Sequence, residues 1–362
     1  MIKILFVTNY LCQGGVEKSL INLLNSLDKK IYEINVLCIV KKNELANQIN
    51  HEINVKYIFN DNIRGVDKLF KYIPTNILYR LFIRQKYDVE VAYSDGKATK
   101  LIGNNSVSKS KKFAWIHQDL ERYDKLMNCY KSWDEYRQSY SQFNKVFCVS
   151  SKCRESYSLK IGYNNTEILY NIIPKSIINK ANEKIKLFDK RLKLITVGRL
   201  SQEKGQLRLL KILKKLMDEG YEFVYLIVGD GPQREMIEKY ITENAMNKYI
   251  YIYMTGFTEN PYKYMSKSDL YICPSYTEAL STTCIESLIL NIPVLSTNVP
   301  GADEIIDMHY GMIVSNDDKS IYEGIKKILN NQDMLLQWKI ADKNLSKFDE
   351  RIIIERLNNY FM

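Results

Sequence analysis

The sequence has few of the residues that hold metal ions or crosslink a chain. Its 362 residues include three histidines and seven cysteines. The cysteines are scattered and odd in number, and no two of them form a C-x-x-C pair. The sequence therefore offers neither a zinc-ligand spacing nor a disulfide framework. A reducing cytosol is the simplest compartment for such a chain.

Long apolar runs are also missing. No stretch approaches the roughly 18–20 consecutive apolar residues that a membrane-spanning helix needs. The apolar run Ile4–Val7 is too short for the core of a signal peptide, and it ends in Thr8 and Asn9. We therefore expect a first β-strand at this point and a cytoplasmic protein.

Acidic residues are fewer than basic ones. The chain carries 52 lysines and arginines against 42 aspartates and glutamates, which gives a formal net charge of +10. A basic chain suggests an anionic partner, such as nucleic acid, a membrane surface or a phosphorylated ligand. Zinc fingers and aromatic RNP-like strands are absent, so we expect no nucleic-acid partner.

The length predicts two domains, because one hydrophobic core rarely serves 362 residues. Short apolar, β-branched runs alternate with helical-period segments such as Gly15–Leu27 and Gln206–Glu219. This alternation is typical of βα units and a parallel sheet, so the expected fold class is α/β. The predicted strands are Ile2–Val7, Glu33–Ile39, Val55–Phe59, Val89–Ala92, Lys112–Ile116, Lys145–Val149, Glu167–Leu169, Leu192–Val197, Glu222–Val228, Ile250–Met254, Leu270–Cys273, Pro293–Ser296 and Gly311–Val314.

The domain boundary is expected near Asn171–Asp189. This segment contains Pro174, loses strand periodicity and is rich in lysine and asparagine, which indicates a linker. We therefore expect one doubly wound domain over residues 1–172 and a second over 173–345. If the two face each other, the carboxyl ends of both sheets surround one cleft, which is where ligands bind in such sheets.

The most informative segment is Pro274–Pro300, which places Glu278 and Glu286 eight positions apart around a predicted helix start. A loop glutamate can accept hydrogen bonds from sugar hydroxyls, and a helix glutamate can accept a pair from a ribose. The free backbone amides of Ala279–Thr282, at the helix N-terminus, suit a diphosphate. Taken alone, two solvated glutamates near a helix start are the more common interpretation.

Two cations follow the strand that ends before Gly198. Arg199 and Lys204 lie in the loop between that strand and the next helix. Fixed positive charges in such a loop would stabilise the charge that builds on a departing nucleoside diphosphate. Basic loop residues without further context are more often simply solvated.

Two glycine loops also follow strands. In Val228–Pro232, Gly229 permits a close backbone approach to a ligand or a tight turn, and the motif alone is weak evidence. After the first strand, Gly14 and Gly15 open a helix, as in a loop that approaches phosphate or sugar. The third glycine of G-x-G-x-x-G is absent, which argues against a nicotinamide-dependent dehydrogenase.

These elements, in this order, resemble the family-4 retaining glycosyltransferases of the GT-B fold. The matching text spans nearly the whole chain: GGVEK, AWIHQD, GRLSQEKG, VGDGP, TGF and the E-x7-E pair. The nearest likeness is to bacterial enzymes that build capsule or other cell-surface glycans. The resemblance implies two doubly wound Rossmann-like domains facing across a cleft. Residues 1–172 would lie on the acceptor side, 173–345 would bind the nucleotide-sugar, and a helix over 346–362 would return to the first domain.

The resemblance also implies roles for single residues. Glu278 would contact the donor sugar and Glu286 the ribose, while Arg199 and Lys204 would hold the diphosphate with help from Gly15. The candidate catalytic residues are His117, Glu278, Arg199 and Lys204. The candidate donor-binding residues are Gly14, Gly15, Gly198, Gly229, Phe257, Thr258, Ala279, Leu280, Ser281, Thr282 and Glu286.

Further roles concern the base and the reacting carbon. The backbone around Phe257 and Thr258 would take the base, and His117 would reach the transferred sugar, although a lone histidine after a strand is more often structural. Ala279 stands where the family usually has glycine, so the choice of donor sugar cannot be copied from better-matched relatives.

No two aspartates have the D-x-D spacing with which GT-A glycosyltransferases hold a metal ion. We therefore expect no metal and no cofactor. The resemblance implies a nucleotide-sugar as donor substrate, a UDP-sugar or a similar one. The family precedent is a same-face attack in which the leaving phosphate helps to deprotonate the acceptor hydroxyl.

A stretch of the first domain, Arg64–Lys86, is both basic and apolar, and Pro74 is expected to divide it into two short helices. Such a segment can lie on an anionic membrane at the inner face, and a basic cluster at Lys109, Lys111 and Lys112 would add attraction. The acceptor would then be a lipid-diphosphate-linked glycan. In the alternative, the apolar residues pack on the domain's own sheet and the charges are solvated.

Two other functions remain open. A sugar-nucleotide epimerase shares the GT-B architecture and needs no acceptor. A non-catalytic subunit could bind a glycan or a partner enzyme. Such a protein would tolerate loss of the donor-site charges, yet all of them are present: Glu278, Glu286, Arg199 and Lys204.

Overall fold

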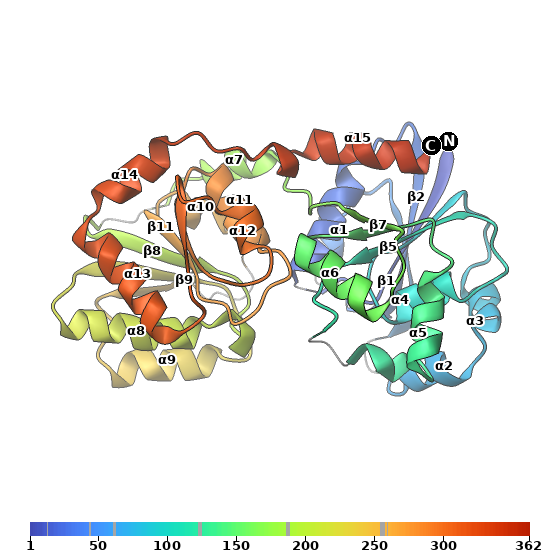
Figure 1. Ribbon diagram of the computed structural model, residues 1–362, viewed down its shortest axis with the longest axis horizontal. Coiled ribbons are helices and arrows are strands. Elements are labelled where there is room, and N and C mark those ends of the chain that lie inside the picture. The colour runs from blue at the N-terminus through green and yellow to red at the C-terminus, as the bar shows by residue number, and fades with distance from the viewer. Residues whose placement is uncertain are drawn as a thin grey trace. The chain divides into compact units, whose positions relative to one another are not determined.

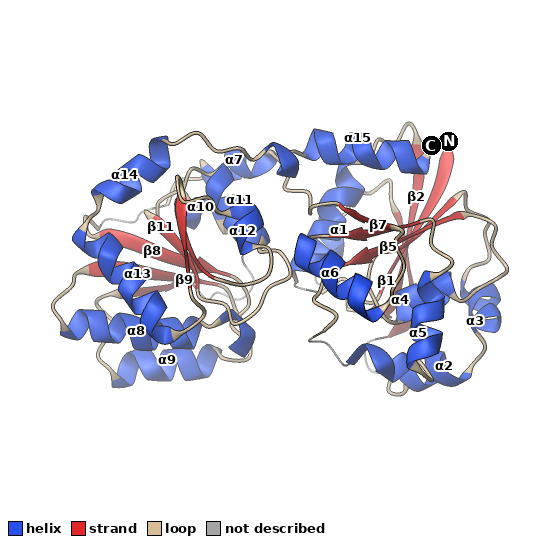
Figure 2. Ribbon diagram, viewed as in Figure 1, coloured by secondary structure: helices blue, strands red, loops and turns tan. Residues whose placement is uncertain are grey.

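The computed structural model describes residues 1–12, 14–42, 45–60, 63–121, 125–185, 189–253, 258 and 260–362. These residues form two compact units, each with a parallel sheet and helices (Figures 1 and 2). Unit 1 comprises Met1–Ile172 and Lys347–Met362, and unit 2 comprises Ile173–Ser346. The expected α/β class is confirmed.

The sheet of unit 1 has the strand order β3-β2-β1-β4-β5-β6-β7, and its neighbouring strands pair in parallel. The order reverses between β1 and β4, which creates a switch point where crevices form in open parallel sheets. Its strands are β1 Ile2–Thr8, β2 Tyr32–Lys41, β3 Asn54–Asn60, β4 Val89–Ala92, β5 Lys111–Ile116, β6 Lys145–Cys148 and β7 Thr166–Ile168. Its helices are α1 Gly15–Ser26, α2 Val66–Tyr72, α3 Thr75–Phe82, α4 Lys97–Gly103, α5 Trp133–Tyr140, α6 Ser151–Lys160 and α15 Glu350–Phe361.

The helix α15 joins unit 1 after the chain has built unit 2. The ring of Phe361 is buried edge-on against Phe6 and Tyr32, with centroids 6.4 and 6.2 Å apart. The hydroxyl of Tyr32 donates a hydrogen bond of 2.8 Å to Asn358. Aromatic packing and this partly buried hydrogen bond fix α15 on unit 1.

The sheet of unit 2 has the order β10-β9-β8-β11-β12-β13, again with parallel neighbours. Its switch point lies between β8 and β11. The strands are β8 Leu192–Val197, β9 Phe223–Val228, β10 Ile250–Tyr253, β11 Leu270–Cys273, β12 Val294–Thr297 and β13 Gly311–Val314. The helices are α7 Ser176–Ala181, α8 Gln206–Asp218, α9 Arg234–Glu243, α10 Tyr262–Met265, α11 Thr282–Ile289, α12 Ala302–Ile305, α13 Asp318–Asn330 and α14 Asp333–Ile340.

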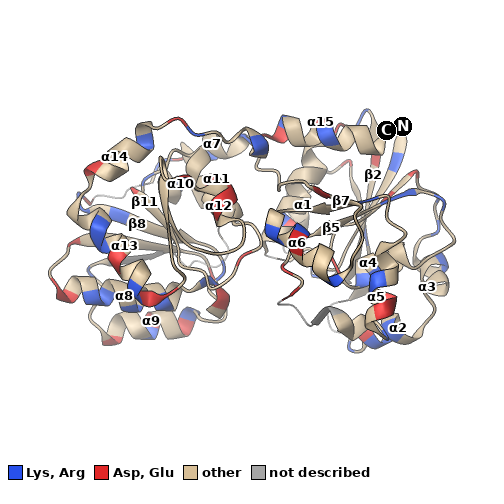
Figure 3. Cartoon of the chain, in the orientation of Figure 1, with Lys and Arg blue, Asp and Glu red and all other residues tan. Residues whose placement is uncertain are grey.

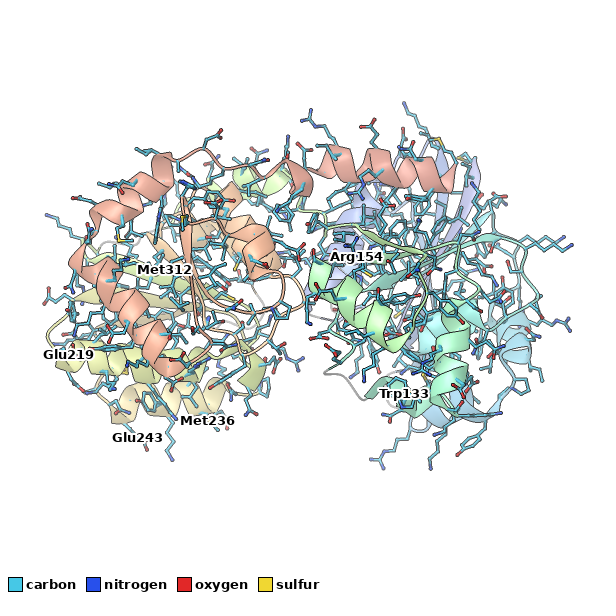
Figure 4. The ribbon with its side chains drawn as sticks, in the orientation of Figure 1. Trp133, Arg154, Glu219, Met236, Glu243 and Met312 are labelled. Carbon is cyan, nitrogen blue, oxygen red and sulfur yellow. The ribbon has the colours of Figure 1, made fainter. Side chains whose placement is uncertain are left out.

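One core holds unit 2 together. Buried apolar residues of α8, α9, α13 and α14 pack with those of β8, β9 and β11. Leu209, Leu213 and Leu216 of α8 recur at helical spacing and are fully buried, which explains why this segment is an amphipathic helix. On the outer surface, Figure 4 shows Glu219, Met236 and Glu243 pointing away from this core.

The strands agree closely with those expected, with ends that differ by at most two residues; Met254, the predicted end of one strand, lies outside the described residues. The linker interpretation of Asn171–Asp189 omitted α7. This helix forms because Ile177 and Ala181, four residues apart, are both buried. Within the described ranges, no helix is long and apolar enough to cross a membrane.

Candidate functional site

Three loops of unit 2 follow the neighbouring strands β9, β8 and β11. Because the strands are parallel, the loops at 229–233, 198–205 and 274–281 begin at the same edge of the sheet. These loops carry most of the candidate residues that the sequence placed in the second half of the chain. Phe257 lies outside the described residues, and Thr258 is half-buried.

Glycines allow the three loops to touch. A Cβ on Gly229 would lie 1.9 Å from the carbonyl oxygen of Gly198, and one on Gly205 would lie 2.2 Å from that of Pro274. Both glycines have positive φ, +151° and +71°. For Gly229 the structure therefore shows close packing against a neighbouring loop, which the sequence did not predict, and contact with a ligand remains a proposal.

Lys204 and Glu278 form an ion pair within this layer of loops. The Lys204 Nζ lies 2.7 and 2.8 Å from the two carboxylate oxygens of Glu278. The hydroxyl of Ser275 donates a further hydrogen bond of 2.7 Å to Glu278. The sequence assigned these two side chains to different parts of a ligand, and the structure brings them together 74 residues apart in the chain.

The pair is only partly withdrawn from solvent, since the Lys204 side chain is 33% exposed and that of Glu278 10%. Burial alone would lower the pKa of Lys204, but attraction and hydrogen bonding from Glu278 outweigh it and raise that pKa above its ordinary value. The lysine is therefore a cation at neutral pH. Nearby, Arg199 is exposed, and its carbonyl accepts a hydrogen bond of 3.1 Å from Gln206.

The helix α11 begins at Thr282 with Ser281 as its N-cap, which confirms the predicted start. The Ser281 hydroxyl accepts a hydrogen bond of 3.4 Å from the amide of Cys284. Helix geometry leaves the amides of the first turn without intrahelical acceptors, and the dipole makes this end positive. Leu280 is buried beside the cap, and Ala279 is half-buried.

Glu286 lies on the second turn of α11, as expected, but its carboxylate is buried. Its exposed fraction is 1%, and it accepts a hydrogen bond of 3.1 Å from the hydroxyl of Tyr262 in α10. A role toward a ribose remains a proposal and would involve this tyrosine.

Arg208 and Tyr276 support the loop of Glu278, and neither was predicted from the sequence. The guanidinium of Arg208 lies 4.5 Å from the centre of the Tyr276 ring. It also donates hydrogen bonds of 2.6 Å to Asp318 and 2.7 Å to Asn316. Asn316 in turn donates to the carbonyl of Tyr276 at 3.0 Å. No motif marks these residues, because the contacts join segments about 70–110 positions apart.

In unit 1, Gly14 caps α1 and Gly15 is its first residue. A Cβ on Gly15 would have no atom within 4 Å, whereas one on Gly14 would lie 2.2 Å from the carboxylate of Glu17. The surroundings of Gly15 therefore leave open space at the start of this helix.

His117 follows β5 in unit 1, and its ring lies 4.6 Å from that of Tyr93. The Tyr93 hydroxyl is 2.9 Å from that of Ser19 in α1. Burial lowers the pKa of His117 to about 3. The imidazole is therefore neutral at pH 7 and can form hydrogen bonds without carrying charge.

Asp95, which follows β4, is a buried carboxylate that the sequence did not single out. It accepts hydrogen bonds from the hydroxyls of Tyr136 at 2.9 Å and Tyr140 at 2.7 Å, and from the Gly96 amide at 2.6 Å. Burial raises its pKa although these hydrogen bonds act in the opposite direction. Gln118, next to His117, also reaches it at 3.4 Å.

The basic and apolar stretch Arg64–Lys86 forms α2 and α3, divided at Pro74 as predicted. Phe70 and Leu78 are buried in unit 1, whereas Ile77 and Leu81 are more than half exposed. Figure 3 shows the charged residues of α2 in the same unit. The buried side chains agree with packing inside the domain, and contact of the exposed ones with a membrane remains a proposal.

Lys112 corrects the proposed surface cluster. It is only 5% exposed, and its Nζ donates a hydrogen bond of 2.8 Å to the Asn105 carbonyl. Burial lowers its pKa. The expectation that Lys112 attracts a membrane was wrong, because its position on β5 directs the side chain inward.

Two curated relatives of this chain are glycosyltransferases. Residues 178–345 match the family model of glycosyl transferases group 1. An N-acetylgalactosamine-N,N'-diacetylbacillosaminyl-diphospho-undecaprenol 4-alpha-N-acetylgalactosaminyltransferase from Campylobacter jejuni is 31% identical over 194 residues, covering 52% of this chain and 51% of the relative. The capsular polysaccharide biosynthesis glycosyltransferase CapM of Staphylococcus aureus is 27% identical over 196 residues, covering 51% and 49%. The chain spans about half the length of these curated relatives.

Solved structures extend the likeness to the whole chain. HepE of Anabaena in complex with UDP and glucose has a TM-score of 0.78 and 17% identity, covering 99% of both chains. A TarM variant of S. aureus in complex with UDP has a TM-score of 0.74 and 13% identity, covering 100% of both. The fold is that of the GT-B glycosyltransferases, as the sequence predicted.

Within that class, the family match lies in one half of the chain. The matched residues 178–345 cover nearly all of unit 2. Assignment to family 4 stays a prediction.

Proposed function

We propose that this chain is a retaining glycosyltransferase that transfers a sugar from a UDP-sugar to a growing, lipid-linked cell-surface glycan. The observation that carries the proposal is the layer of three loops in unit 2, with the Lys204–Glu278 pair at its centre, inside the segment that matches the group 1 model. The solved relative HepE binds UDP and glucose, and the Campylobacter relative acts on a diphospho-undecaprenol acceptor. These names support the donor and acceptor classes.

Binding of the donor would change the partners of both Lys204 and Glu278. Glu278 compensates the charge of Lys204. A diphosphate would share Lys204 and draw on exposed Arg199 and the first amides of α11. Glu278 would then accept hydrogen bonds from sugar hydroxyls, with Ser275 still holding one of its oxygens. The ion pair thus keeps both side chains in place before the donor arrives.

The reaction would follow from this arrangement of charges. As the bond between the anomeric carbon and the phosphate oxygen breaks, negative charge collects on the diphosphate, and the cations of unit 2 stabilise it. The acceptor hydroxyl attacks from the same face, forms the new glycosidic bond and gives its proton to the leaving phosphate. Neutral His117 would supply a hydrogen bond to the sugar rather than a charge. In this scheme the protein's cations, without a metal ion, neutralise the leaving group.

The lipid-linked acceptor would bring unit 1 to a membrane surface. Ile77 and Leu81, exposed on α3, and Tyr72, exposed at the end of α2, offer apolar contacts beside lysines and arginines of the same stretch. Such a contact would place the protein at the inner face of the membrane.

A donor screen tests the proposal. Nucleotide-sugars would be added singly to the full chain, with thermal unfolding as the readout, because a bound donor raises stability by mass action. We expect a UDP-sugar to raise the unfolding temperature in the wild type and not in a variant with both Arg199→Ala and Lys204→Met. No shift with any nucleotide would favour a non-catalytic subunit, and conversion of the UDP-sugar without acceptor would favour an epimerase.

A further inference from the structure

A hollow lies in unit 1, and none of the residues that line it was a candidate for donor binding or catalysis. Its volume is about 330 Å³, within the range of small-molecule sites. Tyr10 follows β1, and Lys42 follows β2, while Lys97 opens α4 and Lys68 lies on the first turn of α2. The hollow therefore lies at the carboxyl ends of β1, β2 and β4, beside the switch point of the sheet.

The lining of this hollow is positively charged. Among the described residues that line it are three lysines, Lys42, Lys68 and Lys97, and one acidic residue, Asp67. The Nζ of Lys97 forms an ion pair of 2.7 Å with Asp67. The described lining residues therefore carry a net charge of +2. The uncompensated charges are those of the exposed side chains of Lys42 and Lys68.

An aromatic ring lies among these charges. The Nζ atoms of Lys42 and Lys97 are 5.4 and 5.7 Å from the centre of the Tyr10 ring. Backbone hydrogen bonds hold the segments together, since the Leu11 amide donates to the Lys42 carbonyl at 2.9 Å and the Val40 amide to Asn9 at 3.0 Å. Tyr10 and Lys42 thus keep a fixed spacing. Lysines around an aromatic ring suit a ligand that joins an oxyanion to a ring with C–H faces, which is the chemistry of an acidic sugar.

We propose that this hollow binds a sugar oxyanion of the acceptor, a phosphate or carboxylate carried by a sugar ring. The oxyanion would lie between Lys42 and Lys68, and the sugar ring would lie near Tyr10. The phosphate could join the glycan to its lipid carrier, or the charged group could be a substituent within the glycan. The inference rests on the proposed glycosyltransferase function, and it assigns a binding place in unit 1 to an anionic group of the acceptor.

Binding measurements on the full chain test this without an activity assay. The probes are glucose 1-phosphate, glucuronate and neutral glucose, titrated by calorimetry in the presence of saturating UDP so that the donor loops of unit 2 are occupied. We expect at least one of the two anions to bind and glucose to bind at least tenfold more weakly. Binding of glucose 1-phosphate without binding of glucuronate would indicate the phosphate that links the glycan to its lipid. Binding of both anions would indicate a charged substituent of the glycan.

Matched variants locate the binding. In the double variant Lys42→Ala, Lys68→Ala, we expect the anion's affinity to fall about 10-fold or more, because charge-assisted hydrogen bonds are lost. The control Lys30→Ala, Lys56→Ala removes two exposed lysines of unit 1 outside the hollow. It should change the affinity for the anion less than twofold. UDP affinity should be equal in all three proteins. If the double variant binds as the wild type does, or if glucose binds as tightly as the anions, the proposal is overturned. If UDP binds to none of the three proteins, the proposed donor site in unit 2 is wrong. The anion titrations still test the proposed site in the hollow.

Discussion

Replacing Lys204 by methionine should weaken both folding and donor binding, because one ammonium group serves both. In the absence of donor, the substitution leaves Glu278, 10% exposed, with the hydroxyl of Ser275 as a remaining partner. Breaking a fully buried pair costs about 3–5 kcal/mol, and an exposed pair contributes about 0.2–1 kcal/mol. Because Lys204 is a third exposed, we expect a loss of about 1–2 kcal/mol in the free energy of unfolding.

A matched control comes from another ion pair of unit 2. Lys326 lies 2.7 Å from Glu219, and its side chain is 33% exposed, as that of Lys204 is. Its partner is 38% exposed, so water replaces the lost contact more easily. Lys326→Met should therefore destabilise the protein less than Lys204→Met does and leave nucleotide binding unchanged.

The assay combines urea unfolding with calorimetric titration of UDP. Loss of one charge-assisted contact of about 1.5–3 kcal/mol corresponds to a roughly 10- to 100-fold weaker affinity for UDP in Lys204→Met. Glu278→Gln removes the competing carboxylate and should leave UDP affinity equal or higher. The reasoning is refuted if Lys204→Met and Lys326→Met have equal stability and equal UDP affinity.

Three further predictions concern other parts of the chain. Gly229→Ala should destabilise unit 2 by about 2 kcal/mol or more, because its Cβ would collide with a backbone oxygen. Gly15→Ala should be neutral or slightly stabilising, because the space around it is open. Urea unfolding measures both changes, and equal free energies of unfolding for the two variants would contradict the packing argument. Since the pKa of His117 is lowered to about 3, the unfolded chain binds a proton more readily below pH 6.5, and stability should fall by about 1.4 kcal/mol per pH unit toward pH 4. His117→Asn should flatten that dependence in unfolding experiments from pH 7 to 4, and an unaltered slope would show that the imidazole is solvated. Changing Ile77 and Leu81 to serine should reduce co-sedimentation with anionic vesicles without changing UDP affinity, and undiminished sedimentation would remove α3 from the membrane contact.

The elements of the fold were predictable because their signals are local. Strand runs, the division at Pro74 and the start of α11 depend on neighbouring residues, and the structure has them where they were expected. The short helix α7 was missed because a helix of six residues with two buried positions leaves little periodic signal.

The contacts within the site were not predictable from local pattern. The motifs placed Lys204 and Glu278 at one sheet edge, but their ion pair joins loops 74 residues apart. The support of Tyr276 by Arg208 and the hydrogen bonds from tyrosines to Asp95 are likewise made through space. Lys112 was expected at the surface because a charged residue within a strand usually faces solvent, and here its side chain is buried and forms a hydrogen bond.

The most direct test of the central claim is the binding of a UDP-sugar to the full chain in excess chelator. We expect saturable binding with EDTA present, and at least a 100-fold loss of affinity when Arg199→Ala and Lys204→Met are combined. Binding that requires a divalent metal ion, or binding that survives the loss of both cations, would contradict the claim that these side chains neutralise the diphosphate.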